Sequence, residues 1–141
     1  MTIEPVKVEL GPEPVAIGIV ISDSDASLAF YRDLLGMTHE GDMPMPVGGG
    51  GTMHRLRCGP TLVKLVSFDT NPEAKAPGGG FADGLGYRYI TINVSNVADT
   101  VAACDEAGHQ ILMKAVELRP GVSIGMVADP DGNVVEFIQY G

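Results

Sequence analysis

The chain has 141 residues and a formal net charge of −9, from 18 acidic and 9 basic side chains. A chain of this length suits one domain with its own hydrophobic core, here taken as residues 1–141. The acidic balance argues against nucleic acids and anionic membranes as partners, because both bind basic patches.

The N-terminal segment MTIEPVKVEL does not begin with basic residues followed by an apolar run, so we expect no signal peptide. No stretch approaches the roughly 18 apolar residues of a membrane helix. The two cysteines, Cys58 and Cys104, are too few for a disulfide framework, and we expect both to be reduced. These features predict a cytoplasmic protein without a membrane segment.

The first half begins with a strand over residues 15–21, followed by polar residues that can cap a helix over 26–35. Gly36 is a natural helix stop, because glycine tolerates the left-handed conformation that ends many helices. Three strand-like runs follow, over residues 37–41, 52–58 and 61–68. The half therefore reads βαβββ.

The second half repeats this order. A strand ends at Val94, a helix is expected over 97–107, and Gly108 stops it. Pairing Ile21 with Val94 gives an offset of 94 − 21 = 73, and pairing Gly36 with Gly108 gives 72. Three further strands are expected over residues 110–115, 122–128 and 134–140. The chain is thus expected to consist of two repeat halves, about 14–68 and 87–140.

Two segments rich in glycine and proline interrupt the repeats. Residues 41–51, GDMPMPVGGGG, form either a flap over a ligand or a long mobile hairpin. Residues 69–86 are expected to form an exposed linker between the halves.

Strand alternation separates the two faces of the expected sheet. On the face opposite the helix, the first strand carries only the small residues Ala16, Gly18 and Val20, which leaves room for a ligand. The equivalent strand of the second half presents Tyr89, Thr91 and Asn93.

Lys64 and Glu136 occupy corresponding positions in the last strand of each half, because 136 − 64 = 72. Each is an ionisable residue within an apolar strand, which costs free energy unless the charge is paired, hydrogen-bonded or used.

Two motifs resemble a known family. The run from Val20-Ile21-Ser22-Asp23 through Ser27 to Gly36 is similar to the opening of the vicinal oxygen chelate superfamily, which includes glyoxalases, bleomycin resistance proteins and extradiol dioxygenases. Residues 129–137, DPDGNVVEF, resemble its closing signature. The resemblance implies an α+β fold in which two βαβββ repeats form a cup-shaped, partly closed mixed sheet, and it implies a homodimer.

The resemblance also locates the family's metal ligands, on four strands that face the cup. The matching positions here are Ala16, Lys64, Tyr89 and Glu136, of which only Glu136 is a typical ligand. We therefore expect a divergent member with no metal at this site and no cofactor.

Lys64 offers a replacement for the cation, since its ammonium can polarise a carbonyl or stabilise an enolate. Glu136 can move a proton, and Tyr89 can donate a hydrogen bond. An inert ion pair between Lys64 and Glu136 is the structural alternative. The residues expected to contact the substrate are Ala16, Gly18, His54, Leu62 and Thr91. Which face His54 occupies is left open, and His39 and His109 are expected to be solvated.

Three functions compete. The first is a metal-independent, glyoxalase-like lyase or isomerase acting on a small carbonyl or carboxylate compound through Lys64, Glu136 and Tyr89. The second is a non-catalytic small-molecule binder of the antibiotic-resistance type. The third is a metal-dependent lyase or dioxygenase with unusual ligands, for example His54 and Glu136 with residues of a second subunit.

Overall fold

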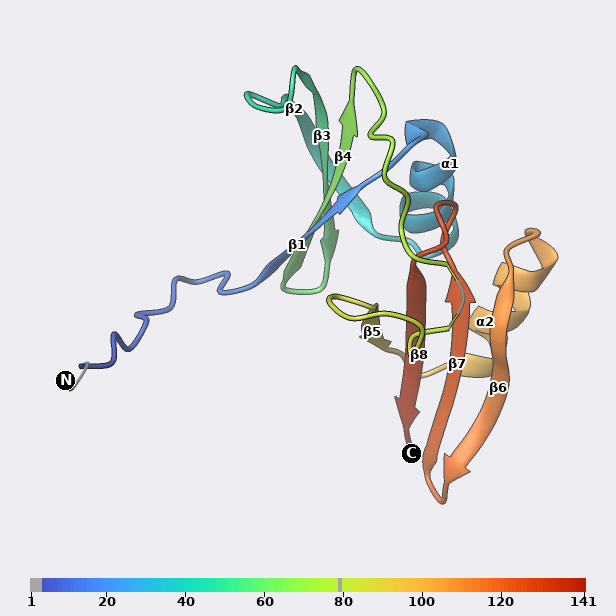
Figure 1. The fold of residues 1–141 in the computed structure, drawn as a ribbon. Coiled ribbons are helices and arrows are strands. Elements are labelled where there is room, and N and C mark those ends of the chain that lie inside the picture. Colours follow the sequence, from blue (N-terminus) through green and yellow to red (C-terminus); the bar gives the residue numbers. More distant parts are fainter. Residues whose placement is uncertain (1–3, 79) are drawn as a thin grey trace.

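The computed structural model describes residues 4–78 and 80–141. Its elements lie in two halves, each with one helical segment and four strands (Figure 1). The first half comprises β1 (Ala16–Val20), α1 (Ser24–Leu28), η1 (Ala29–Leu34), β2 (Thr38–Pro44), β3 (Gly51–Cys58) and β4 (Thr61–Phe68). The second comprises β5 (Tyr89–Asn93), α2 (Val97–Glu106), β6 (Ile111–Arg119), β7 (Val122–Ala128) and β8 (Val134–Tyr140).

Each half forms its own four-stranded mixed sheet. The strand orders are β1-β4-β3-β2 and β5-β8-β7-β6, and the parallel pairs are β1 with β4 and β5 with β8. The two sheets lie side by side without closing into a barrel (Figure 1). The predicted α+β fold of two βαβββ repeats is confirmed.

The two faces of each sheet differ as the alternation predicts. The face packed against the helices, here called the outer face, carries apolar residues such as Leu56, Leu65, Val135 and Phe137, all at most 1% exposed. These residues join both halves in one hydrophobic core. The opposite face, here called the cup face, is exposed along β1 and β5, in which exposed and partly buried residues alternate. The cup face is therefore where a ligand can reach the sheets.

The first helix starts earlier than predicted, at Ser24. The Asp23 side chain accepts a hydrogen bond of 3.1 Å from the backbone N–H of Ala26, which satisfies one free donor of the first turn. The segment continues as a π-helix over Ala29–Leu34 and stops before Gly36, whose φ is 78°. In α2 the Asn96 side chain does not cap a backbone N–H and instead accepts from the Thr100 hydroxyl at 3.2 Å, while Val97 N–H donates to the Gln139 side chain at 3.0 Å.

A buried hydrogen bond connects the halves. Tyr31 of η1 donates its hydroxyl to Asp129, at 2.6 Å, in the turn before β8. Asp129 is 4% exposed and also accepts backbone hydrogen bonds from Asp131 and Asn133. Burial, and then the negative charge of Asp129, raise the pKa of Tyr31 far above its ordinary value, so the phenol stays protonated.

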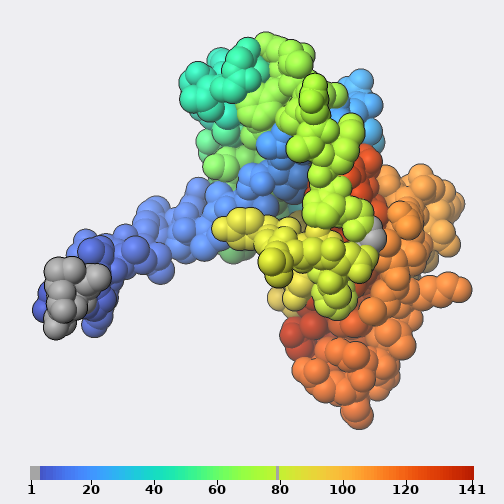
Figure 2. Space-filling view, viewed as in Figure 1, coloured from blue at the N-terminus to red at the C-terminus, as the bar shows by residue number. Residues whose placement is uncertain are grey.

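The remaining segments lie outside the core. Residues 4–15 are exposed and extend away from the two sheets (Figures 1 and 2). The described residues between 69 and 87 are also exposed, and this linker crosses the front of the second half in Figure 2. Within the described part of the chain, no helix combines the length and apolar character required to cross a membrane.

Candidate functional site

The cup face of the first sheet is defined by the register of its strands. Gly18 of β1 lies opposite Lys64 of β4, which lies opposite Arg55 of β3. Side chains on directly paired residues share one face. A Cβ atom built on Gly18 would meet no atom within 4 Å, so this part of the face is open space.

The cup face of the second sheet carries the polar residues expected there. Thr91 of β5 lies opposite Glu136 of β8, and the Thr91 hydroxyl donates a hydrogen bond of 2.8 Å to the Glu136 carboxylate. Tyr89 precedes them on the same face, is 51% exposed, and packs edge-on against Phe81 of the linker. Thr91 thus positions one oxygen of Glu136 and leaves the other free to contact a ligand.

The structure does not bring Lys64 and Glu136 together within the single chain. Each is partly buried on its own sheet. Among the described residues, no carboxylate lies within 4.0 Å of the Lys64 ammonium, and Glu136 likewise has no cationic partner. An intramolecular ion pair, the inert alternative for these residues, is therefore not formed here.

Two cations are adjacent on the first sheet. Arg55 and Lys64 are direct cross-strand neighbours, and the only side-chain bond of Arg55 in the described residues is a contact of 3.9 Å to Met43 sulfur. Like charges placed opposite each other destabilise a sheet unless an anion lies nearby. By contrast, neighbouring Arg57 bonds Glu13 at 2.8 Å and Glu40 at 2.9 Å. Lys64 and Arg55 thus leave positive charge available on an otherwise acidic protein.

A small cavity lies where β1 approaches β5 and β8. Its volume is about 210 Å³, and it is lined by Gly18, Tyr89 and Val134 together with Tyr87 and Arg88, which directly precede β5. Pockets that enclose a small molecule usually measure ~300–1,000 Å³. This cavity therefore has the size of part of a binding site. Of the other residues expected to contact substrate, Ala16 is exposed at the start of β1 and Leu62 is buried, 7% exposed, opposite Ala16.

A larger cavity of about 380 Å³ lies on the outer face. It is lined by the end of η1, by β5 and by α2, including Met37, Ile92 and Phe137. None of the residues expected to act on a substrate faces it. We therefore place the candidate site on the cup face.

The expectation that His54 contacts the substrate is corrected. His54 pairs with Leu65, a core residue of the outer face, and is only 7% exposed. Its ring lies between Asp42 at 2.8 Å and Ser24 of α1 at 2.9 Å. This position on the outer face also removes it from a metal site shared with Glu136.

The other two histidines are partly buried rather than fully solvated. His39 lies within β2, 2.6 Å from the same Asp42, and His109 packs against Phe30 with the ring centres 4.7 Å apart. The cluster of His39, Asp42 and His54 escaped the sequence analysis, because its members lie on two strands whose pairing is offset by a bulge between His39 and Gly41.

The four positions implied for family metal ligands do not fit a metal. The Ala16 methyl cannot coordinate, the Lys64 ammonium repels a dication, and the neutral Tyr89 phenol is a poor ligand. Glu136 alone offers one carboxylate, which already accepts a hydrogen bond from Thr91. These four side chains therefore do not form a metal-binding set.

The fold matches known proteins over most of its length. Residues 14–137 match the family described as the Glyoxalase/Bleomycin resistance protein/Dioxygenase superfamily. A glyoxalase family protein from Bacillus cereus superposes with a TM-score of 0.79 at 14% identity, over 99% of both chains. A V278E glyoxalase I mutant from Zea mays gives 0.70 at 20% identity, over 87% of this chain and 43% of that one.

A third similar structure is the trypanothione-dependent glyoxalase I of Leishmania major, with a TM-score of 0.63 at 25% identity, over 88% of this chain and 84% of that one. No curated protein matches the sequence significantly. The family match covers most of the chain, and the superpositions agree with it in fold. The chain therefore belongs to the Glyoxalase/Bleomycin resistance protein/Dioxygenase superfamily.

Proposed function

We propose that this protein is a metal-independent lyase or isomerase that acts on a small carbonyl or carboxylate compound in the cup. The observation that carries the proposal is the adjacent pair Arg55 and Lys64, which has no carboxylate within 4.0 Å among the described residues although the chain has a net charge of −9. An anionic substrate compensates these charges. The open space at Gly18 beside them admits it.

The chemistry requires one acid–base group and one electrophile. The Glu136 carboxylate removes a proton from the carbon next to the substrate carbonyl, and the electron pair of that C–H bond forms an enolate. The Lys64 ammonium stabilises the negative oxygen of the enolate, which is the role that a cation fills in such reactions. When the carbon that loses the proton also bears a hydroxyl, the enolate is an enediolate. Return of the proton to the former carbonyl carbon, with transfer of the hydroxyl proton to the former carbonyl oxygen, then gives the isomer. Tyr89 donates a hydrogen bond to the substrate.

The proposal includes a homodimer in which each cup is completed by a second copy. Lys64 and Glu136 lie on separate sheets that do not close, and the cup faces of β1 and β5 expose Val20 at 49% and Tyr89 at 51%. A second copy that packs its second sheet over the first sheet covers these side chains. The same packing places its Glu136 opposite Lys64 and enlarges the 210 Å³ cavity.

Turnover and binding test the proposal on the full chain after dialysis against EDTA. The probes are pyruvate, 2-oxoglutarate and oxaloacetate with their 2-hydroxy analogues, each followed by proton NMR for chemical change and for exchange of the α-proton in deuterium oxide. We expect α-proton exchange with at least one probe. Lys64→Ala and Glu136→Gln are each expected to lower its rate by about 100-fold or more.

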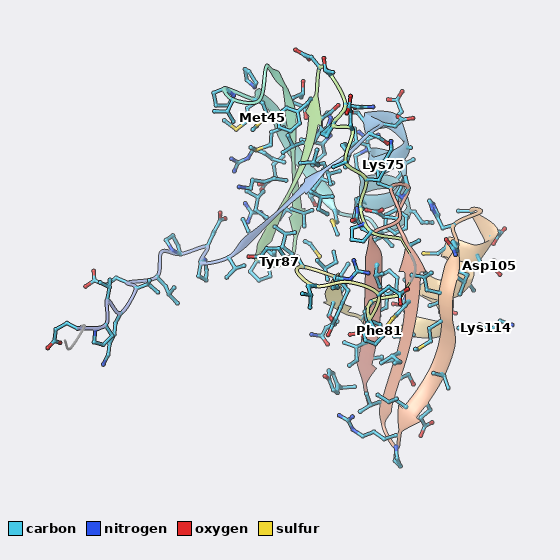
Figure 3. All side chains as sticks on the ribbon, in the orientation of Figure 1. Met45, Lys75, Phe81, Tyr87, Asp105 and Lys114 are labelled. Atoms are coloured by element: carbon cyan, nitrogen blue, oxygen red, sulfur yellow. The ribbon has the colours of Figure 1, made fainter. Side chains whose placement is uncertain are left out.

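Two residues of β6, the edge strand of the second sheet, provide matched controls. Lys114→Ala and Glu117→Gln remove the same chemical groups from exposed positions of β6, and Lys114 projects away from the body in Figure 3. Both controls are expected to keep the full rate. Equal rates in the Lys64 variant and its control, or activity that appears only after addition of a divalent metal, contradict the proposal.

A second candidate function, non-catalytic binding of a planar small molecule, is favoured by the aromatic side chains beside the cup. Tyr87, Tyr89 and Phe81 are all at least 45% exposed, and Phe81 and Tyr87 lie on the linker in Figure 3. Exposed aromatic rings offer stacking surface to a flat ligand. Recovery of such a ligand unaltered after long incubation, with no α-proton exchange in any keto acid, favours binding over catalysis.

A further inference from the structure

Three potential ligand groups converge on the outer face of the first sheet, away from the cup. The groups are the rings of His39 and His54 and the carboxylate of Asp42, and one ligand atom from each lies within 4.8 Å of the others. Asp42 Oδ1 lies 2.6 Å from Nε2 of His39 and 2.8 Å from Nδ1 of His54. The group spans β2 and β3, so it is created by the pairing of these strands.

The groups are graded in exposure from buried to open. The side chain of His54 is 9% exposed, that of His39 23% and that of Asp42 49%. An ion can therefore enter from the Asp42 side. The buried His54 ring would then bind the ion from the protein interior.

The hydrogen bonds around the rings determine what binding requires. A carboxylate only accepts, so both ring nitrogens beside Asp42 carry hydrogen in the metal-free protein. For an ion to replace these hydrogens, each proton must move to the other ring nitrogen. On His54 that nitrogen lies 2.9 Å from Ser24 Oγ, which can accept the new hydrogen bond. Such an outer partner commonly orients a metal-bound histidine.

His39 faces a different neighbour. Its Nδ1 lies 3.4 Å from the guanidinium of Arg32, which can only donate. That contact must open when Nδ1 becomes protonated. Arg32 can move away from His39, because its side chain is 39% exposed. Its ion pair with Asp33, at 2.8 Å, does not depend on the contact with His39.

We propose that His39, Asp42 and His54 form a binding site for a divalent transition-metal ion such as Zn²⁺, outside the cup and separate from the proposed function. Two imidazoles and one carboxylate are ligands that zinc accepts, and water completes the coordination. Zinc–ligand bonds of about 2.0–2.2 Å separate tetrahedral ligand atoms by roughly 3.4 Å. Each ring nitrogen must therefore move less than ~1 Å away from the Asp42 oxygen, and the two ring nitrogens, which lie at most 4.8 Å apart, must approach each other by no more than ~1.4 Å.

The bound ion stabilises one part of the fold. It joins β2 to β3 on either side of the loop over residues 45–50, whose glycines 48, 49 and 50 have positive φ. Through Ser24, the same cluster contacts the start of α1. An ion here therefore holds the hairpin and the first helix together, since it binds the folded chain and not the unfolded one.

Zinc chloride titrated into the full, EDTA-stripped chain tests the site. We expect one ion per chain by calorimetry and a rise in melting temperature. We also expect selective shifts of the His39 and His54 ring signals in NMR, with those of His109 unchanged. Cobalt(II) chloride serves as a second probe and is expected to give an absorption spectrum of a nitrogen- and oxygen-ligated ion.

Variants decide between this site and others. His39→Gln and Asp42→Asn are each expected to weaken zinc binding by at least 10-fold, whereas the control His109→Gln and the thiol control Cys58→Ser leave it unchanged. Arg32→Ala is expected to tighten binding several-fold. Zinc affinity unchanged in both His39→Gln and Asp42→Asn, or lost in Cys58→Ser, overturns the proposal, and His39→Gln alone decides it if Asp42→Asn fails to fold.

Discussion

The two halves share a backbone plan but use the same register position of the outer face in different ways. In the second half Gly125 lies opposite Phe137, and in the first half His54 lies opposite Leu65. A Cβ atom at Gly125 would lie 2.5 Å from Val101 of α2, so the absence of a side chain lets that helix pack closely. His54 instead supports a polar cluster beneath the start of α1. One repeat unit thus yields an apolar helix contact in one copy and a candidate ion site in the other.

The cup faces show a second difference between the halves. Lys64 lies opposite Gly18 in the first sheet, and Glu136 lies opposite Thr91 in the second, at matching positions of the repeat. The apolar outer faces are similar in both halves because they serve the same core, whereas the cup faces carry opposite charge. This complementarity is what two copies of one chain need to pair a first sheet with a second sheet.

Loss of the carboxylate that joins the halves is expected to have the largest effect on stability. Asp129→Ala leaves the Tyr31 hydroxyl, the amide of Asn133 and two backbone N–H groups without their acceptor. We expect the free energy of unfolding to fall by about 3–5 kcal/mol, because one buried donor and three partly buried donors lose a charged partner. Denaturation by urea measures this change.

The control for this variant is Asp105→Ala, which removes an exposed carboxylate on α2 (Figure 3). We expect it to change stability by less than about 0.5 kcal/mol. If both substitutions have the same effect, the turn before β8 does not connect the halves in the way described.

A second substitution tests the other side of this junction. Tyr31→Phe is expected to cost between about 1.5 and 3 kcal/mol, the range for a hydrogen bond to a charged group. Burial raises the Tyr31 pKa in the folded state, so its contribution to stability is complete below the ordinary tyrosine pKa of about 10 and is lost as the pH rises above it. The variant should therefore lose less stability than the wild type between pH 9 and 11, and equal losses would show that Tyr31 is not buried as a neutral phenol.

Two glycines distinguish the packed face from the open one. Gly125→Ala places a methyl group against Val101 and is expected to destabilise the protein by about 1–3 kcal/mol. Gly18→Ala meets no atom within 4 Å and is expected to leave stability nearly unchanged while it weakens binding of the keto acid that exchanges its α-proton. A Gly18 variant that unfolds more readily than the Gly125 variant would reverse the assignment of the two faces. Thermal and urea denaturation measure the stability changes, and NMR titration measures the binding.

Much of the fold followed from local signals. The bounds of β4, β7 and β8 agree with the sequence analysis, because Gly59-Pro60 and the turn over residues 129–133 mark where the chain reverses. The first helix was less accessible. The helix begins at Ser24 because the Asp23 side chain caps its first turn. The change from α-helix to π-helix at Ala29 cannot be predicted from hydrophobic periodicity.

The candidate site was only partly predictable. Alternation placed Gly18, Lys64, Thr91 and Glu136 on the cup face, since each lies within a regular strand. The face of His54 depended on which residues of β4 pair with β3. The contact of His54 with Asp42 depended further on the bulge in β2. Pairings between distant segments decide such contacts, and one sequence does not specify them.

In the proposed dimer a second copy completes the cup by placing its Glu136 opposite Lys64, and reversal of these two charges is the sharpest test of that packing. Sedimentation equilibrium gives the dimer dissociation constant of the wild type, of Lys64→Glu, of Glu136→Lys and of the double variant. We expect each single reversal to weaken the dimer by about 10-fold or more and the double variant to recover most of that loss. A wild-type chain that stays monomeric at every concentration, or a double variant as weak as the two single effects added together, would show that Lys64 and Glu136 do not meet across a dimer interface.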